Sequence, residues 1–385
     1  MLLVAGIAAV LMTIVALFLG AVQVQDLLSF IKFDTLAMLF SLMAVVVMLE
    51  RIGAVKVVSQ SLLRHARKGS GLTLAMVMLP FFLSMIVTND VALISMVPLA
   101  IATMRAAHCE KQLPWVICLQ TVAANLGSMA TPIGNPQNIH LVTFYKIPVA
   151  EFMATILPLT MVAFVCLVVA CFFTLRGHDV NAETPNKNTQ SETCGDASLG
   201  IRAKIVIGIC IVLFAICIAA VSGAISVWIA AAFVLIAVLV FDVRALTKVD
   251  YSLLLTFVFF FIFAGCIGAI PQVVDVITRA FSGNEFWCAV GASQIISNVP
   301  AAVLLSNFTS NYRELLLGVN IGGLGTPIAS LATLISYNLY AKAERESINE
   351  NGVNKHNGAT RFLALYLLVS VVGILVLYMA KLLIL

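Results

Sequence analysis

Continuous apolar runs of about membrane-crossing length are the feature that most constrains this chain. Runs such as 201–221 and 224–243 hold about 20 residues with few charges. A bilayer interior offers the backbone no water, so such runs cross it as helices whose backbone groups bond internally. Only 10% of the residues are charged and 62% are hydrophobic, whereas a soluble domain is about a quarter charged. The sequence therefore predicts an all-α polytopic membrane protein.

Hydropathy predicts about nine spanning helices. They are expected at 2–21, 34–51, 114–145, 150–175, 201–221, 224–243, 251–270, 313–341 and 361–383. The first run has no basic start of the kind that precedes a signal peptide, so it is interpreted as a retained span. The polar stretch 341–360 is predicted to be a cytoplasmic loop.

Basic residues predict the orientation. With the N-terminus in the cytoplasm, 17 of the 22 Lys and Arg residues fall in inside loops, as the positive-inside rule requires. The sequence therefore predicts a multi-pass protein of the cell inner (plasma) membrane, with its N-terminus cytoplasmic and its C-terminus outside.

Two of the predicted spans contain copies of one helix-breaking motif. Residues 125–133 are N-L-G-S-M-A-T-P-I, and residues 320–328 are N-I-G-G-L-G-T-P-I. Glycine and proline interrupt helices, and irregular backbone at membrane depth survives only where it is buried or lines a cavity. The runs 114–145 and 313–341 are therefore predicted to be two broken helices.

A second pair of motifs interrupts the apolar segments 71–106 and 286–311. The first contains Thr88-Asn89-Asp90, and the second contains Ser297-Asn298-Val299-Pro300. Each segment is too short for two crossings of about 20 residues. We therefore expect two re-entrant helical hairpins whose tips carry these motifs.

The paired motifs indicate an internal repeat. Residues 34–55 and 250–270 both begin with Asp and end in I-G-A-V or I-G-A-I. Five crossings separate the copies, and an odd number inverts the second copy, as in many secondary transporters. The predicted organisation is a first transmembrane helix at 1–29, repeat 1 at 30–175, a cytoplasmic linker at 176–200, connecting helices at 201–249 and repeat 2 at 250–385.

The tips and breaks are the candidate binding site. Carbonyl and side-chain oxygens there can replace the hydration shell of Na⁺, and helix N-termini favour anions. Ser, Thr and Asn also cap ordinary helices, but four motifs in two-fold register favour a site. The candidate residues are Thr88, Asn89, Asp90, Asn125, Gly127, Ser128, Thr131, Pro132, Asn135, Asn138, Ser297, Asn298, Asn320, Gly322, Thr326 and Pro327. His140, just after the first break, is a weaker candidate for lining the same cavity.

Asp90 is the most informative of these residues. A carboxylate in an apolar segment with no nearby Lys or Arg is costly and marks function by default. It could carry a proton, ligate Na⁺ or cap its helix, and the second half has Val299 at the matching position. One charged coupling site is therefore expected, with Asn89, Asp90 and Asn298 as candidate Na⁺ ligands.

Other functional classes find no support in the chain. Its nine cysteines show no metal-binding spacing, and the sequence has no hydrolase, metalloprotease or nucleotide-binding motif. The net charge of +4 is small and loop-borne, which argues against a nucleic-acid partner. We therefore expect neither an enzyme nor a cofactor other than Na⁺.

The run A-N-L-G-S-M-A-T-P-I-G-N-P-Q-N-I at 124–139, with G-T-P-I-A-S-L-A-T-L-I at 325–335, resembles the ion transporter superfamily. This group includes arsenite permeases, sodium/proton antiporters and sodium-coupled dicarboxylate carriers, and the chain looks most like the arsenite-permease and anion-permease branch. The resemblance implies a homodimer in which the tip and break residues bind substrate and coupling ion. The Ser-Asn-Thr triplets of the dicarboxylate carriers are replaced here by Thr88-Asn89-Asp90 and Ser297-Asn298-Val299.

These features predict a secondary active transporter of a small inorganic or carboxylate anion, coupled to Na⁺ or H⁺ by alternating access. The alternatives are an arsenite or antimonite efflux permease, a Na⁺/H⁺ antiporter and, from a different class, a passive channel.

Overall fold

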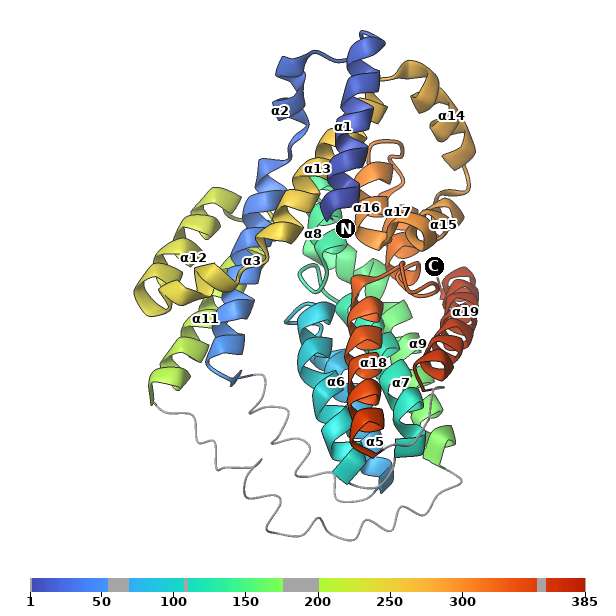
Figure 1. Cartoon of the computed structure of the whole chain (residues 1–385). Coiled ribbons are helices and arrows are strands. Elements are labelled where there is room, and N and C mark those ends of the chain that lie inside the picture. The colour runs from blue at the N-terminus through green and yellow to red at the C-terminus, as the bar shows by residue number, and fades with distance from the viewer. Residues whose placement is uncertain (1, 55–68, 107–109, 176–200, 352–357, 385) are drawn as a thin grey trace. The chain divides into compact units, whose positions relative to one another are not determined.

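The computed structural model of this chain describes residues 2–54, 69–106, 110–175, 201–351 and 358–384 (Figure 1). Every regular element in these ranges is helical, which confirms the predicted all-α class. The predicted linker at 176–200 lies outside the described residues.

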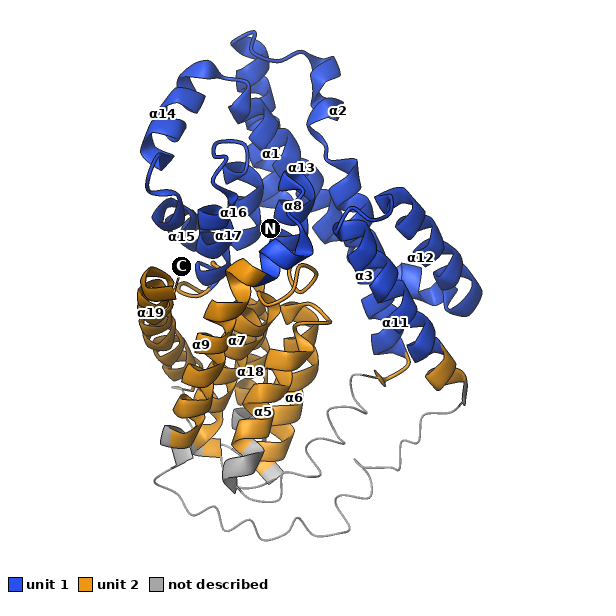
Figure 2. Ribbon diagram, turned by 180° about the vertical axis from the view of Figure 1, so that it is seen from behind, with its two compact units in different colours: residues 1–51, 136–153, 206–323 blue, residues 52–135, 154–205, 324–385 orange. Residues whose placement is uncertain are grey.

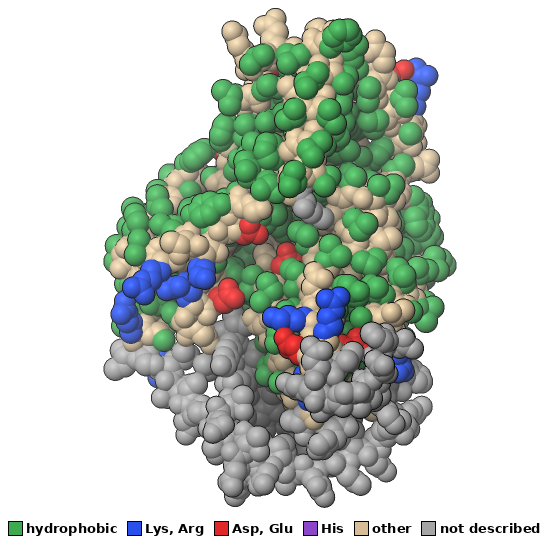
Figure 3. Space-filling view, in the orientation of Figure 1, with side chains coloured by type: hydrophobic (Ala, Val, Ile, Leu, Met, Phe, Trp, Pro, Cys, Tyr) green, Lys and Arg blue, Asp and Glu red, His purple; other side chains and the backbone are tan. Residues whose placement is uncertain are grey.

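Five helices among the described residues are long and apolar enough to cross a membrane. They are α3 (Phe33–Arg51), α9 (Val149–Leu175), α11 (Ile201–Val221), α13 (Tyr251–Gly268) and α19 (Gly358–Ile384). The helices α1 (Leu2–Phe18) and α12 (Val227–Phe241) are apolar but shorter, so the expected number of spans stays a prediction. Large hydrophobic side chains are exposed on several of these helices, and they cover much of the face in Figure 3, as expected of a surface that meets lipid.

Both predicted interruptions of the first half are present. Helices α5 (Gly69–Leu83) and α6 (Asn89–Ala106) pack together and are joined through residues 84–88. Helices α7 (Leu113–Ser128) and α8 (Pro136–Tyr145) are separated by residues 129–135. Pro136 opens α8, where the missing N–H would have no helical partner in any case.

The second half repeats this arrangement. Helices α15 (Glu285–Ile296) and α16 (Asn298–Leu305) are separated by Ser297 alone. Helices α17 (Tyr312–Ile321) and α18 (Leu331–Asn351) flank the second break at residues 322–330. Gly325 in this break has a φ of 112°, a conformation that glycine adopts without steric cost.

The chain forms two compact units that do not follow sequence order (Figure 2). Unit 1 comprises residues 1–51, 136–153 and 206–323, and unit 2 comprises residues 52–135, 154–205 and 324–385. The boundary after Asn135 falls at the end of the first break, and that after Gly323 falls within the second. Unit 2 therefore combines α5, α6 and α7 with α18, whereas unit 1 combines α15, α16 and α17 with α8.

Unit 2 is organised around α7, whose side chains are almost all buried. Helices α5, α6, α18 and α19 pack against it. A Cβ on Gly127 would overlap the Phe81 carbonyl group of α5, so only glycine permits this approach. In unit 1, α13 packs against α1, α3 and α16, and α8 packs against α3, α16 and α17.

Two helical segments were not expected from the sequence. The stretch 341–360 was predicted to be a loop, but α18 continues to Asn351; its Ala, Lys, Glu and Arg residues are strong helix formers, and Glu344 accepts hydrogen bonds from the backbone N–H groups of Gly358 and Ala359 (2.7 and 2.8 Å). Helix α14 (Pro271–Phe281) is a short amphipathic helix between α13 and α15. The remaining short elements are α2 (Leu27–Phe30), η1 (Val24–Asp26), η2 (Glu110–Gln112) and η3 (Val243–Lys248).

Candidate functional site

The tip of the first hairpin is tied to the first broken helix in unit 2. Asn89 opens α6, and its Nδ2 donates a hydrogen bond to Oδ1 of Asn125 on α7 (2.9 Å). Ser330 Oγ, just before α18, donates to the same oxygen (2.9 Å). All three residues are buried. The acceptor Asn125 Oδ1 thus joins three segments that lie far apart in the sequence.

The first break folds back on this network. Asn135 Nδ2 donates to Ser128 Oγ (2.6 Å), and Ser128 Oγ donates to the backbone carbonyl of Asn125 (3.0 Å). Thr131 Oγ1 donates to the Met85 carbonyl at the hairpin tip (2.7 Å). Asn135 Oδ1 is buried and has no hydrogen-bond partner among the described residues. We call Asn89, Asn125, Ser128, Thr131, Asn135 and Ser330 the unit 2 cluster.

Tyr366 of α19 is a member of this environment that sequence reasoning missed. Its hydroxyl accepts a hydrogen bond from Thr333 Oγ1 (2.8 Å) and lies beside Asn125 and Ser370. Both Tyr366 and Ser370 are fully buried. The available signal was two polar residues at i, i+4 in the apolar run 361–383, which places them on one helix face.

A corresponding network lies in unit 1. Asn320 of α17 donates through Nδ2 to Asn138 Oδ1 of α8 (2.7 Å) and to the Leu316 carbonyl (2.8 Å). Because that carbonyl can only accept, the amide nitrogen of Asn320 is identified. Its Oδ1 is buried and has no partner within the described part of the chain. Asn138 belongs to the first half of the sequence, so residues of both halves meet in this network.

The second hairpin tip lies against the second break within unit 1. A Cβ on Gly323 would come within 2.8 Å of Asn298 Nδ2, so the Asn298 side chain lies directly against this glycine. Gln294 Nε2 donates to the Gly322 carbonyl (2.8 Å). We call Asn138, Gln294, Asn298 and Asn320, together with Gly322 and Gly323, the unit 1 cluster.

Ser297 holds the second tip in an unusual backbone conformation. Its φ is 76° and its ψ is 153°, a region populated almost only by glycine. The residue is 1% exposed. Such a conformation costs a non-glycine residue about 1–3 kcal/mol and is typical of functional sites. Thr88, the matching tip residue, is not among the residues with positive φ.

The remaining candidates lie at the same tips and breaks. Asp90 is half-buried in the first turn of α6, and Thr88 precedes that turn. Pro132 is buried in the first break, whereas Thr326 and Pro327 are half-buried in the second. Gly127 and Gly322 are tightly packed, because protein atoms occupy the space that a Cβ at either position would take.

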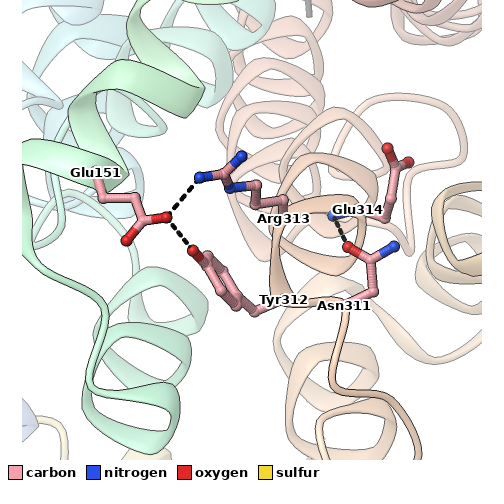
Figure 4. A network of polar contacts seen from close by, with 5 residues as sticks. All are labelled: Glu151, Asn311, Tyr312, Arg313 and Glu314. Atoms are coloured by element: carbon pink, nitrogen blue, oxygen red, sulfur yellow. Dashed lines mark hydrogen bonds and ion pairs between the residues drawn. The ribbon is translucent and has the colours of Figure 1, made fainter.

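His140 departs from these clusters. It is buried in α8, and its Nε2 lies 3.0 Å from Ser306 Oγ, which follows α16. Nearby, Tyr145 donates to the carbonyls of Ser306 and Thr309 (2.9 and 2.7 Å). Figure 4 shows a further link in unit 1, where the Glu151 carboxylate accepts from Tyr312 and from Arg313 (2.6 Å for Arg313). These contacts fasten α8 to the segment that follows α16, and the first turn of α9 to the start of α17.

The polar side chains of both clusters are neutral: amides in unit 1, and amides and hydroxyls in unit 2. Among the described residues, no three His, Cys, Asp or Glu side chains group as metal ligands. Neutral oxygens and amides can bind a small ion and release it again. Buried polar breaks between the helices of a largely apolar, all-helical chain are typical of a membrane transport protein.

The comparisons with known proteins place the chain in a family. A model described as "Citrate transporter" (CitMHS) matches residues 2–312, and the chain belongs to this family of transporters. This membership confirms the resemblance to the ion transporter superfamily and the expectation that the protein is a transporter rather than an enzyme.

Three relatives illustrate the range of similarity. An uncharacterized transporter of Methanocaldococcus jannaschii is 31% identical over 329 residues, covering 85% of this chain and 86% of that protein. The inner membrane protein YbiR of Escherichia coli is 32% identical over 313 residues, covering 80% and 79%. The silicon efflux transporter LSI3 of Oryza sativa is 28% identical over 137 residues, covering 36% and 28%.

Proposed function

We propose that this chain is a secondary active transporter that moves a small anion or oxyanion across the inner membrane, driven by a Na⁺ or H⁺ gradient through alternating access. The observation that carries this proposal is a buried amide oxygen in each unit, on Asn135 and on Asn320, that no described residue pairs. Leaving a buried acceptor unpaired costs about 1–3 kcal/mol. Na⁺ is a hard cation that oxygen ligands suit, and binding it would offset this cost.

The helix ends supply the complementary charge for an anion. Helices α6 and α16 begin at Asn89 and Asn298, within the two tips. A helix N-terminus carries partial positive charge and unpaired N–H groups, both of which favour anions. The two clusters contain no Lys or Arg, so the bound anion would be held by dipoles and hydrogen bonds and could be released.

The coupling step rests on Asp90. Its carboxylate is half-buried beside Asn89, and it would carry a proton or help to ligate Na⁺ together with Asn89. The paired motifs support inverted-topology repeats, the resemblance supports a homodimer, and the name of the YbiR relative supports an inner-membrane location.

A second candidate is efflux of arsenite in its neutral, fully protonated form, As(OH)₃. The relative LSI3 is named as a silicon efflux transporter, and clusters of neutral amides suit an uncharged substrate. A Na⁺/H⁺ antiporter is a third candidate, for which Asp90 would be sufficient.

Thermal unfolding of the purified protein with a panel of anions, each with and without Na⁺, tests the proposal. A ligand of the folded state at a hundred times its Kd stabilises by about 2.7 kcal/mol. We expect one anion to act only when Na⁺ or low pH is present, and Asn320→Ala to remove the effect. Asn338→Ala is the matched control, because Asn338 is an exposed amide of α18. Stabilisation by arsenite alone would favour efflux, and an effect of Na⁺ or pH without any anion would favour antiport.

A further inference from the structure

A small pocket in unit 1 lies apart from the tip cluster. It is walled by Phe30, Phe144 and Phe261, and its buried end includes His140. Lys32 and Asn307 also line it, and both are exposed, so they mark its open end. The cavity has a volume of about 40 Å³, and one water needs about 10–15 Å³ by such a measure. A ligand of a few heavy atoms therefore fits.

Helix α16 gives the distance between the second hairpin tip and this pocket. Ser306, the partner of His140, comes eight residues after Asn298. At 1.5 Å per residue, this separates the two positions by about 12 Å along the helix. The pocket is therefore a second location in unit 1, and a ligand bound there is independent of the transport function proposed for the two clusters.

The hydrogen bonds of Ser306 determine which nitrogen of His140 carries the proton. Ser306 Oγ donates to the Val303 carbonyl (3.0 Å), so its single hydrogen is committed. The Oγ atom must therefore accept from His140 Nε2 (3.0 Å). A neutral imidazole with hydrogen on Nε2 has a lone pair on Nδ1. That Nδ1 atom is buried and has no partner among the described residues.

A positive charge stands at the other end of the pocket. The Lys32 ammonium lies 5.8 Å from the centre of the Phe144 ring, which in turn lies 5.4 Å from the His140 ring. No carboxylate of a described residue forms a salt bridge with Lys32. The ammonium disfavours a cationic ligand. An anion without an O–H group would place its oxygen lone pairs against the lone pair of His140 Nδ1, and the two would repel each other.

We propose that this pocket binds a small, singly protonated oxyanion. Its hydroxyl donates a hydrogen bond to His140 Nδ1, and its charged oxygen faces the Lys32 ammonium. The aromatic walls exclude water from the hydrogen bond and so strengthen it. The ligand class is therefore the singly ionised form of a polyprotic oxoacid.

Bicarbonate and nitrate form a matched pair of probes. Both are small, planar, singly charged oxyanions, but only bicarbonate carries an O–H group. The full chain, purified in detergent, is titrated with each anion at one pH and one ionic strength, and the unfolding midpoint gives the affinity. We expect bicarbonate to bind about tenfold or more tightly than nitrate, because nitrate leaves the buried Nδ1 unpaired.

Variants at the two ends of the pocket locate the effect. H140Q keeps an amide donor for Ser306 but has no acceptor at the Nδ1 position, so the preference for bicarbonate should disappear. H140N presents an amide oxygen near that position and should keep part of it. K32Q, at an exposed position that folding tolerates, should weaken both anions, whereas K32R should not.

Asn320→Ala separates this pocket from the proposed transport site. Bicarbonate binding should survive that variant, even if transport or Na⁺-dependent stabilisation is lost. Equal binding of the two anions, or no effect of either, would mean that only water fills the pocket and would overturn the proposal. A preference that persists in H140Q and vanishes in Asn320→Ala would assign the oxyanion to the tip cluster instead.

Discussion

Replacing Ser297 by glycine should give a more stable protein than replacing it by alanine. Ser297 adopts a φ of 76° and a ψ of 153°, which costs a residue with a Cβ about 1–3 kcal/mol. Glycine adopts this conformation freely but gains about 0.5–1 kcal/mol of extra freedom when the chain unfolds. The difference favours glycine over alanine at this position by about 0–2.5 kcal/mol.

The cleanest measurement compares Ser297→Gly with Ser297→Ala. Both variants lack the hydroxyl, so their difference reports the backbone conformation alone. The matched control is the same pair at Thr88, which has no positive φ, and there alanine should be the more stable by about 0.5–1 kcal/mol. The preference for glycine or alanine should therefore reverse between the two hairpin tips.

Thermal unfolding in detergent, followed by fluorescence of the three tryptophans, provides the assay. At about 2–4 °C per kcal/mol for domains of 150–250 residues, and less for a longer chain, Ser297→Gly should unfold up to about 5 °C above Ser297→Ala. A glycine variant that unfolds below the alanine variant would refute the strain. If the strain also holds the tip ready for its ligand, Ser297→Gly should show a smaller ligand-induced rise in midpoint than Ser297→Ala.

Three further predictions concern the first break, the first hairpin tip and α19. Gly127→Ala should lower stability by about 3 kcal/mol or more, because the new Cβ overlaps the Phe81 carbonyl; Gly208→Ala, with open space beside it, should be neutral or slightly stabilising in the same melts. Asp90→Asn should abolish gradient-driven uptake into proteoliposomes while leaving exchange or binding in part, and full concentrative uptake would exclude a coupling role. Tyr366→Phe leaves the Thr333 hydroxyl without its acceptor and should cost about 1–3 kcal/mol in the same melts.

The positions at which the helices are interrupted could be predicted from the sequence. Long apolar runs require helices, and the combined glycines and prolines at 127–136 and 322–327 disfavour one, so the breaks fall where the sequence placed them. The same holds for the interruptions before Asn89 and Asn298. These features depend on backbone chemistry within a few residues. The length of α18 was misjudged because polarity was taken to mean a loop, although its residues favour helix.

Which buried polar groups meet was decided by tertiary structure. Asn138 pairs with Asn320, and Ser330 pairs with Asn125, across separations of 182 and 205 residues. The sequence placed each residue at a tip or break, but it did not reveal that each unit takes one segment from the other half. Tyr366 was missed because a tyrosine in an apolar span is unremarkable until its hydroxyl has a partner. The positive φ of Ser297 likewise depends on its surroundings, because a serine on its own strongly disfavours that conformation. Local chemistry thus determined where the helices stop, and packing determined which polar groups those stops bring together.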